Sequence, residues 1–355
     1  MFNERILPWF EQNLAEGLFL MKQPNVRWTS GFRGADTCVL LTAAGGFLIT
    51  DPRYTEQAQL ESPDFTLIDW REIGGSIPAA VAHIAREQRL ARIAFEADAL
   101  PYALWQQLTQ QTDAQLVPTQ DVVETLRTIK TAQELENLQA ACDIACRAFD
   151  RILGDIRVGV TEKQISELLS YYMVSEGADA YPYGKIVISG PNTSLLHGIP
   201  GSRAVEYGDF VLMDYGCQFN GYLSDMTRTV LVGRATQEQR EVYRLEQQMV
   251  ADSLAVIKPG VPLSQVYEAS VQAIWDTPYY PYHYRGIGHG IGLAVHESPY
   301  IRQETTTVFQ PNMVTTIEPG LYIPGWGGVR IEEQIVITED GCRDLVTAPS
   351  ELIEL

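Results

Sequence analysis

Two pairs of carboxylates and one histidine stand in this chain at positions suited to binding divalent metal ions. The five side chains are Asp214, Asp225, His289, Glu318 and Glu332. Each carboxylate pair spans two apolar, strand-like segments joined by a short loop, and the second pair repeats the first about a hundred residues later. Carboxylate oxygens combined with one imidazole favour hard or borderline ions, among them Mn²⁺, Co²⁺ and Zn²⁺. The pattern therefore predicts a site for two divalent metal ions and does not distinguish among these three.

The two strand-like segments of each pair predict a β-hairpin. Asn220-Gly221, a strong turn sequence, lies between the first two carboxylates. Residues directly opposite on antiparallel strands have Cβ atoms about 4.5–5.5 Å apart, so we expect the carboxylates of one hairpin to face each other and share an ion. Two facing hairpins could hold two ions about 3.5–4 Å apart. Solvated carboxylates at strand ends are the alternative, but apolar neighbours such as Val211 and Ile317 favour a buried cluster that cations must neutralise.

The segment that carries His289 has a glycine at every second position, from Gly286 to Gly292. This spacing differs from the G-x-G-x-x-G pattern of dinucleotide-binding loops and argues against that function. Glycines on alternate positions instead indicate an extended segment with one bare face. We expect this face to be open for the close approach of a metal ion or a substrate.

The carboxylate hairpins need a framework, and the surrounding sequence predicts one built from two similar halves. Thr-Ala-Gln-Glu at 131–134 and Thr-Glu-Lys-Gln at 161–164 are capping boxes that predict the starts of two helices. The pattern helix, Ile-x-x-Gly-Val, helix occurs around residues 156–160 and again around residues 257–261. Residues 126–355 are therefore predicted to form one pseudo-two-fold domain with the helices outside and the carboxylates inside.

The first 125 residues differ from the rest in organisation. Residues 39–42, 46–50 and 91–96 have strand character, and residues 79–90 have the pattern of a helix. Alternating strands and helices predict a smaller α/β domain. The fold class of the whole chain is then α+β, with domains at residues 1–125 and 126–355.

Composition restricts the partners and the compartment. The chain has 355 residues, of which 45% are hydrophobic, and this is enough for two packed domains. A formal net charge of −19 argues against nucleic acid and membrane as partners. The five cysteines are odd in number and irregular in spacing, as is typical of a reducing compartment. Without a signal-like start or a membrane-spanning run, a soluble cytoplasmic protein is the expectation.

The motifs resemble the metallopeptidase superfamily of methionine aminopeptidase, aminopeptidase P and prolidase, which has the pita-bread fold. The segments that carry this resemblance are Gly190-Pro-Asn…His197, Met213-Asp-Tyr-Gly216, Ser224-Asp-Met-Thr-Arg228, Gly288-His-Gly-Ile-Gly292, Val295-His-Glu297, Ile317-Glu-Pro-Gly320 and Val329-Arg-Ile-Glu332. Asn25-Val-Arg-Trp and Thr50-Asp-Pro-Arg-Tyr54 are similar to the creatinase/prolidase amino-terminal domain. That domain favours the proline-specific branch.

The resemblance implies a dinuclear exopeptidase that hydrolyses the amino-terminal Xaa-Pro bond of short peptides through a metal-bridging hydroxide. By this resemblance, Asp214 and Asp225 bind one ion, and Asp225 also bridges. His289 and Glu318 bind the other ion, and Glu332 bridges the two.

The resemblance also implies catalytic and substrate-binding roles. Glu318 would move the proton of the nucleophile to the leaving nitrogen. His197 and His296 would line the substrate pocket, with His296 placed to stabilise the oxyanion. Arg330 would orient the metal ligands. The family is often dimeric, so a homodimer is expected.

The sequence departs from its prolidase relatives where they often have an arginine for the carboxylate of the substrate. Tyr300 stands there, and Arg302 follows two residues later. These two residues are the candidates for contacting the far end of the substrate, and the choice between aminopeptidase and dipeptidase stays open. Two other functions remain as alternatives, namely a catalytically silent pita-bread binding protein and an amidohydrolase for another small substrate.

Overall fold

The computed structural model describes residues 4–13, 15–180 and 184–355. The chain divides into two compact units, Met1–Arg127 and Thr128–Leu355. The division falls close to the boundary expected from the sequence. Each unit is described by itself below.

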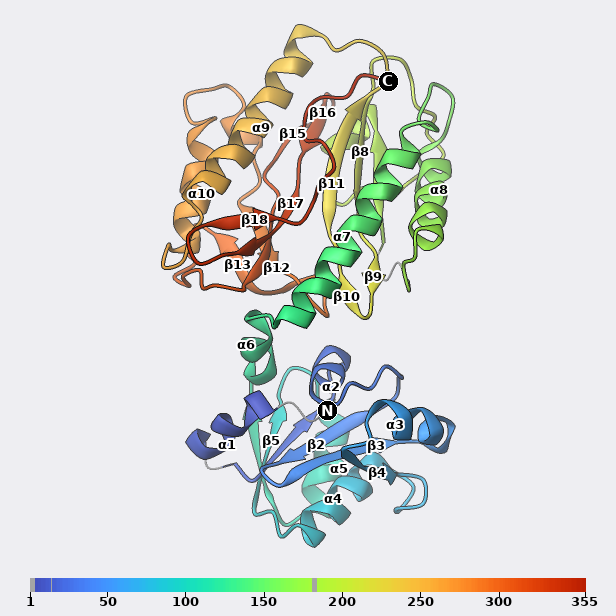
Figure 1. Ribbon diagram of the computed structural model, residues 1–355, viewed down its shortest axis with the longest axis vertical. Coiled ribbons are helices and arrows are strands. Elements are labelled where there is room, and N and C mark those ends of the chain that lie inside the picture. The colour runs from blue at the N-terminus through green and yellow to red at the C-terminus, as the bar shows by residue number, and fades with distance from the viewer. Residues whose placement is uncertain (1–3, 14, 181–183) are drawn as a thin grey trace. The chain divides into compact units, whose positions relative to one another are not determined.

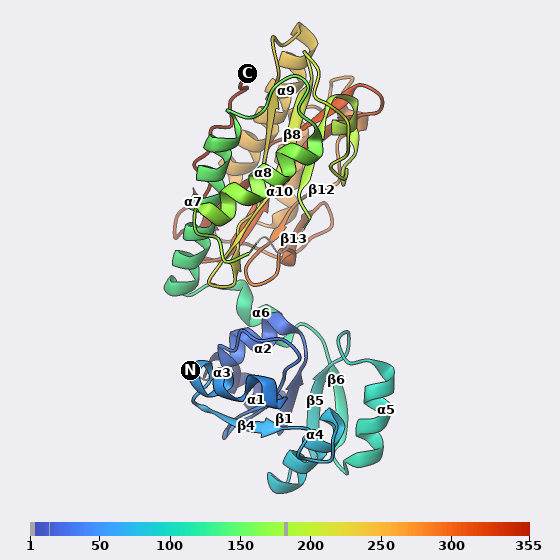
Figure 2. The ribbon, with the colours of Figure 1, turned by 90° about the vertical axis from the view of Figure 1, so that its right-hand side faces the viewer.

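The amino-terminal unit is built on a six-stranded sheet in the order β4-β3-β2-β1-β5-β6. The strands are β1 (Gly17–Leu20), β2 (Cys38–Thr42), β3 (Gly45–Thr50), β4 (Phe65–Asp69), β5 (Arg92–Glu96) and β6 (Gln115–Thr119). The helices are α1 (Leu7–Asn13), α2 (Gln23–Ser30), α3 (Thr55–Glu61), α4 (Ile77–Glu87), α5 (Tyr102–Gln111) and α6 (Val122–Thr128). The predicted strands and the predicted helix are present, and α4 begins early because the Ser76 hydroxyl accepts the Ala79 amide hydrogen. Helices α4 and α5 share one apolar core with the sheet (Figure 2).

Four long helices shape the second unit. They are α7 (Ala132–Ile152), α8 (Glu162–Ser175), α9 (Gln237–Val256) and α10 (Leu263–Gln272). Both predicted capping boxes are present, at Thr131 for α7 and at Thr161 for α8. Helix α9 has a third capping box at Thr236, whereas Pro262 precedes α10 without a side-chain cap. The first helices of the two halves therefore start in the same way, whereas the second helices, α8 and α10, differ in the chemistry of their starts.

The strands of the second unit form two main sheets. One has the order β11-β8-β7 and the other has the order β13-β12-β14-β17-β18. Their strands are β7 (Ile186–Ser189), β8 (Phe210–Tyr215), β11 (Met226–Leu231), β12 (Gly286–Gly290), β13 (Glu297–Arg302), β14 (Val314–Ile317), β17 (Glu333–Ile337) and β18 (Cys342–Asp344). Two short ribbons pair β9 (Gln218–Phe219) with β10 (Tyr222–Leu223) and β15 (Gly320–Ile323) with β16 (Gly327–Arg330).

The helices of both halves pack on the strands in three apolar clusters, two of which also include strand residues of the other half. Helices α7 and α8 share a core with β8 and β11, and α10 shares a core with β12, β14 and β17. Helix α9 packs with β15 and β16 in a further cluster. Figure 1 shows the strands between the α7/α8 pair and the α9/α10 pair. The predicted α+β class is confirmed, and the helices lie outside the strands as expected.

None of the described helices combines the length and the apolar character needed to cross a membrane. All five cysteines are free thiols, and Cys142 and Cys146 are buried on α7 among apolar side chains. Burial raises the pKa of the Cys142 thiol well above its usual value, as expected for a packing residue.

Candidate metal centre

The first carboxylate hairpin differs from the arrangement expected from the sequence. Strands β8 and β11 are antiparallel, and Asp214 lies directly opposite Thr227. Asp225 precedes the first residue of β11. The expectation that Asp214 and Asp225 oppose each other is therefore wrong, because the loop between them sets a register displaced by two residues.

The second hairpin places its carboxylates as expected. Ile317 of β14 pairs with Glu333 of β17 in the five-stranded sheet, and Gly320 pairs with Arg330 at the start of the β15/β16 ribbon. Glu318 and Glu332 lie between these two pairings, in the same register. The strands are interrupted at the two carboxylates, which frees both side chains to turn into the interior.

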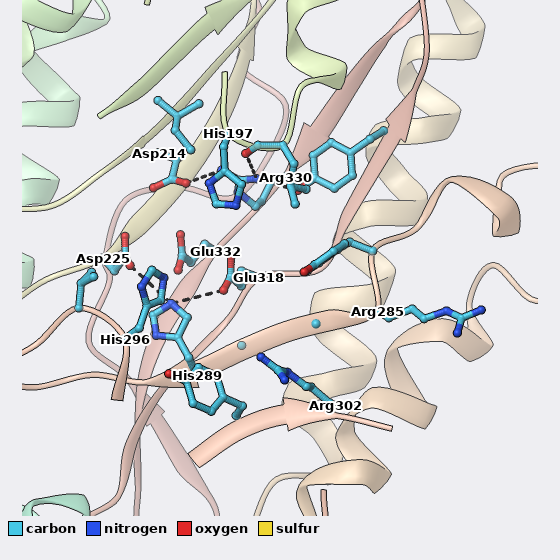
Figure 3. Close-up of a pocket in the computed structure, with 18 of the residues that line it drawn as sticks. His197, Asp214, Asp225, Arg285, His289, His296, Arg302, Glu318, Arg330 and Glu332 are labelled. Atoms are coloured by element: carbon cyan, nitrogen blue, oxygen red, sulfur yellow. Dashed lines mark hydrogen bonds and ion pairs between the residues drawn. The ribbon is translucent and has the colours of Figure 1, made fainter. Parts of the chain in front are cut away.

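Three buried groups from different segments converge on one point. One ligand atom each from Asp225, His289 and Glu332 lies within 4.8 Å of the other two. The His289 Nε2 atom is also 3.4 Å from Glu318 Oε1 and 3.7 Å from Asp225 Oδ2. Figure 3 shows these side chains directed toward a common space. Four of the five predicted ligands are thus neighbours.

The fifth predicted ligand, Asp214, is held by an arginine. The Arg330 guanidinium donates to Asp214 Oδ2 and also donates to the Tyr322 hydroxyl at 2.7 Å. Its Nε donates to Thr227 Oγ1 at 3.1 Å, and the Thr227 hydroxyl donates to Glu332 Oε2 at 2.8 Å. Arg330 is 3% exposed, so this chain of hydrogen bonds is shielded from water. It links a carboxylate of the first hairpin to one of the second.

The chemistry of this cluster fits divalent cations. Glu332 Oε1 is buried and has no hydrogen-bond donor among the described residues. Burial, followed by the nearby charges of Asp225 and Glu318, raises the pKa of the Glu332 carboxyl well above its usual value. Burial likewise raises the pKa of Glu318. Buried carboxylates this close together are stable as anions only beside positive charge, which cations coordinated by Asp225, His289, Glu318 and Glu332 would supply.

The cluster forms one wall of a cavity with a volume of about 560 Å³. The predicted site residues that line this cavity are His197, Asp214, Asp225, His289, His296, Tyr300, Arg302, Glu318, Arg330 and Glu332. His296 and His289 meet edge to face, with ring centroids 4.4 Å apart. Burial, with a smaller contribution from His289, lowers the pKa of His296, which favours the neutral ring.

The two residues proposed for the far end of the substrate lie on β13. Tyr300 and Arg302 are both exposed in the cavity, and the Arg302 guanidinium lies over the Tyr300 ring, 4.9 Å from its centroid. In Figure 3, Arg302 points into the cavity, whereas the neighbouring Arg285 points away from the carboxylates. Arg302 is therefore the better placed of the two arginines to meet a bound peptide.

The glycine-rich segment is a strand, and Gly286 and Gly288 line the cavity. The bare side of Gly288 and Gly290 is filled, because a Cβ atom on Gly288 would lie 2.1 Å from the Thr316 carbonyl oxygen and one on Gly290 would lie 2.4 Å from the Ser298 carbonyl oxygen. At these two glycines the backbone of neighbouring segments occupies the side that we expected a metal ion or substrate to approach. These glycines allow the strands around His289 to pack closely.

The sequence reading missed several side chains that hold the site. Thr227 and Tyr322 contact Arg330, and Gln334 accepts a hydrogen bond from the Asp225 amide at 2.9 Å. Thr227 lies two residues after Asp225, and Tyr322 lies four residues after Glu318, so strand alternation could have placed both on the side of the carboxylates. No local pattern marks Gln334, because its partner is far away in sequence.

Two family models match this chain. The model for metallopeptidase family M24 matches residues 136–339, and the model for the creatinase/prolidase N-terminal domain matches residues 4–129. An uncharacterized peptidase, YqhT of Bacillus subtilis (strain 168), is 37% identical over 353 residues, which cover 99% of each sequence.

Solved structures agree with this assignment over the full chain. The Xaa-Pro dipeptidase from Bacillus anthracis is 35% identical with a TM-score of 0.95, covering 99% of this chain and 98% of that one. The X-Pro aminopeptidase from Thermotoga maritima MSB8 is 30% identical with a TM-score of 0.93, covering 100% of both chains. The predicted pita-bread fold, its creatinase-type amino-terminal domain and the enzyme class are thereby confirmed. This chain is a hydrolase that belongs to metallopeptidase family M24.

Proposed function

We propose that this protein hydrolyses the amino-terminal Xaa-Pro bond of short peptides with the help of two divalent metal ions. The observation that carries the proposal is the buried cluster of Asp225, His289, Glu318 and Glu332 on the wall of a cavity. The similarity to an Xaa-Pro dipeptidase and an X-Pro aminopeptidase supports the choice of substrate. When bound, the metal ions activate water and polarise the scissile carbonyl.

The side chains around the cluster have separate roles in proton transfer, oxyanion stabilisation, orientation of the carboxylates and substrate binding. Glu318 takes a proton from the attacking water and delivers it to the proline nitrogen, which leaves as a secondary amine. Neutral His296 can donate a hydrogen bond to the oxygen that becomes negative in the transition state. Arg330 holds Asp214 and, through Thr227, Glu332 in fixed orientations. His197 lies in a loop at the cavity and contacts the substrate.

Whether the enzyme prefers dipeptides or longer peptides depends on which side chain binds the carboxyl end of the substrate. Arg302 points into the cavity and carries the charge that a free carboxylate requires. We propose that Arg302, beside Tyr300, binds this carboxylate, which favours dipeptides over longer peptides. Comparison of Ala-Pro with Ala-Pro-amide tests this point, because only the first presents a carboxylate. Arg302→Gln should raise the KM for Ala-Pro and leave that for Ala-Pro-amide unchanged.

The principal test is a peptide assay on purified protein loaded with Mn²⁺, the metal that we propose, and in parallel with Co²⁺ or Zn²⁺. Release of free alanine from Ala-Pro or Ala-Pro-Ala is expected. The proposal fails if the metal-loaded protein cleaves neither peptide.

Replacement of Glu318 separates catalysis from binding. Glu318→Gln removes the proton acceptor, and the rate should fall by about 10²–10⁴-fold. Glu351→Gln, an exposed change of the same kind, is the matched control. Equal rates for the two variants would contradict the role given to Glu318.

Two broader parts of the proposal concern the state of the protein in the cell. All five cysteines are free thiols, which supports a reducing compartment and hence the cytoplasm. A homodimer is proposed from the family alone, and light scattering of the purified protein measures it directly.

A further inference from the structure

One buried carboxylate of the catalytic unit lies outside the metal cluster and is fully engaged by a loop. Glu162 is the first residue of α8 and is 1% exposed. Its Oε1 accepts hydrogen bonds from the Ser189 amide at 2.8 Å, the Ser189 hydroxyl at 3.0 Å and the Asn192 side chain at 3.0 Å. Its Oε2 accepts from the Gly201 amide at 3.0 Å. We call these contacts the Glu162 clamp.

The Glu162 clamp closes both ends of one segment, residues 189–201, which we call the His197 loop. Ser189 and Asn192 stand at the beginning of the loop and Gly201 stands at its end. Because one oxygen binds each end, the carboxylate fixes the distance between them. Hydrogen bonds to a charged acceptor are the strong ones, and burial keeps water from competing for them.

The part of the loop near His197 has little apolar packing. Leu195 is 54% exposed and Ile199 is 87% exposed, and the buried neighbour of His197 is Gly198, which has no side chain and lies against Ile188. Two contacts reach the loop from the second half of the unit. The Gly328 amide donates to Thr193 Oγ1 at 2.7 Å, and Arg330 donates to the Leu196 carbonyl at 3.5 Å. The position of His197 at the cavity therefore depends largely on hydrogen bonds, and the Glu162 clamp supplies four of them, at both ends of the loop.

The second half of the unit has no counterpart to this carboxylate. In the helix–Ile-x-x-Gly-Val–helix repeat, Leu263 opens α10 where Glu162 opens α8. Leu263 is fully buried in an apolar cluster, as a residue that serves only the core would be. A carboxylate at the same place is not needed to start a helix, because Thr161 and Gln164 already cap α8.

We propose that Glu162 is a positioning residue for His197, and that the Glu162 clamp sets how this histidine meets the substrate. The inference rests on the proposed peptidase function, which it deepens. Because both carboxylate oxygens of Glu162 accept hydrogen bonds, the isosteric Glu162→Gln change replaces one acceptor by a donor. One end of the His197 loop must then lose its hydrogen bond to the side chain of residue 162.

The decisive experiment compares four metal-loaded proteins, namely the wild type, Glu162→Gln, His197→Ala and the double variant. Glu162→Gln should lower kcat/KM for Ala-Pro by about 10- to 100-fold, because displacement of a substrate-contacting group costs that much. Metal content should equal that of the wild type. In the His197→Ala background, the same change should have no further effect. Multiplicative losses would show that Glu162 acts independently of His197 and would overturn the proposal.

A second readout does not depend on catalysis. Amide hydrogen exchange in residues 189–201 should accelerate in Glu162→Gln, and unchanged exchange would overturn the proposal. Glu167→Gln, an exposed change on the same helix, should leave both readouts unchanged. If Glu162→Gln does not fold, Asn192→Ala removes one contact of the clamp and should show the same two effects more weakly. A wild type that cleaves no Xaa-Pro peptide refutes the proposed function, while hydrogen exchange still decides whether the clamp exists.

Discussion

The two carboxylate hairpins of the catalytic unit arise from similar sequences but present their acids in different ways. In the first hairpin, β8 continues through Asp214, which lies opposite Thr227. In the second, both strands are interrupted where Glu318 and Glu332 face each other. Equivalent motifs therefore supply Asp214 from a regular strand and Asp225 from the residue before a strand in one half, and two carboxylates from a break in the other.

This difference explains why each hairpin needs the other. Asp214 of the first hairpin is held by Arg330 of the second, and Glu332 of the second is held by Thr227 of the first. Gln334 of the second half likewise accepts a hydrogen bond from the Asp225 amide of the first half. The metal centre is a joint product of the two halves, and the exchanged hydrogen bonds are the places where that dependence can be measured.

Among the hydrogen bonds that join the two hairpins, the largest loss of activity is expected from changing Arg330, which contacts both halves. Arg330→Lys keeps the charge but provides a single ammonium group, which cannot reach Asp214, Thr227 and Tyr322 together. Activity or metal affinity should fall by about 10- to 100-fold, as is usual when a partner of metal ligands is lost. Steady-state kinetics and metal titration measure the two quantities.

Arg234→Lys is the matched control for this change, because the Arg234 side chain is 80% exposed. The control should behave like the wild type. If Arg330→Lys also matched the wild type, the two hairpins would not depend on each other through this guanidinium.

A smaller effect is expected at Thr227, where only a hydroxyl is exchanged between the halves. Thr227→Val has nearly the same shape but can neither donate to Glu332 nor accept from Arg330. Activity should fall roughly tenfold, and the free energy of unfolding should fall by about 1–3 kcal/mol because buried polar groups lose a partner. Thr227→Ser keeps the hydroxyl and should restore most of both, and a serine variant as impaired as the valine variant would contradict this explanation.

Much of the architecture could be predicted from local sequence. The capping boxes at Thr131 and Thr161 mark helix starts because their hydrogen bonds join residues three apart. The carboxylates of the second hairpin could be paired correctly because one register continues from the β14/β17 pair through the β15/β16 ribbon. The family motifs then supplied the fold of the whole unit, which the matching structures confirm.

The errors and omissions concern contacts between distant residues. The register of the first hairpin depends on how the loop between Asp214 and Asp225 folds, and the turn sequence alone did not reveal the displacement of two residues. The bare face of Gly288 is filled by the Thr316 backbone, and no local sequence pattern predicts this contact. In the sequence, Glu162 is marked only as part of a helix start, since its partners lie about 30 to 40 residues away.

The smallest effect on activity is expected at Leu263, the counterpart of Glu162 in the second half. Leu263 is fully buried among Val266, Phe309 and other apolar side chains. Leu263→Ala should lower the free energy of unfolding by about 2–5 kcal/mol, because it leaves a cavity. The residue reaches neither the cavity nor a loop that carries a pocket histidine, so kcat/KM of the folded protein should not change.

Denaturant unfolding and kinetics on the same preparation give both numbers for Leu263→Ala. Glu162→Gln is the variant to compare with it. Its kcat/KM should fall strongly, whereas that of Leu263→Ala should not change. If Leu263→Ala lowered kcat/KM as much as Glu162→Gln, any weakening of a helix start in this unit would disturb the site. The specific connection between Glu162 and His197 would then lose its support, and the asymmetry between the two helix starts would be one of packing alone.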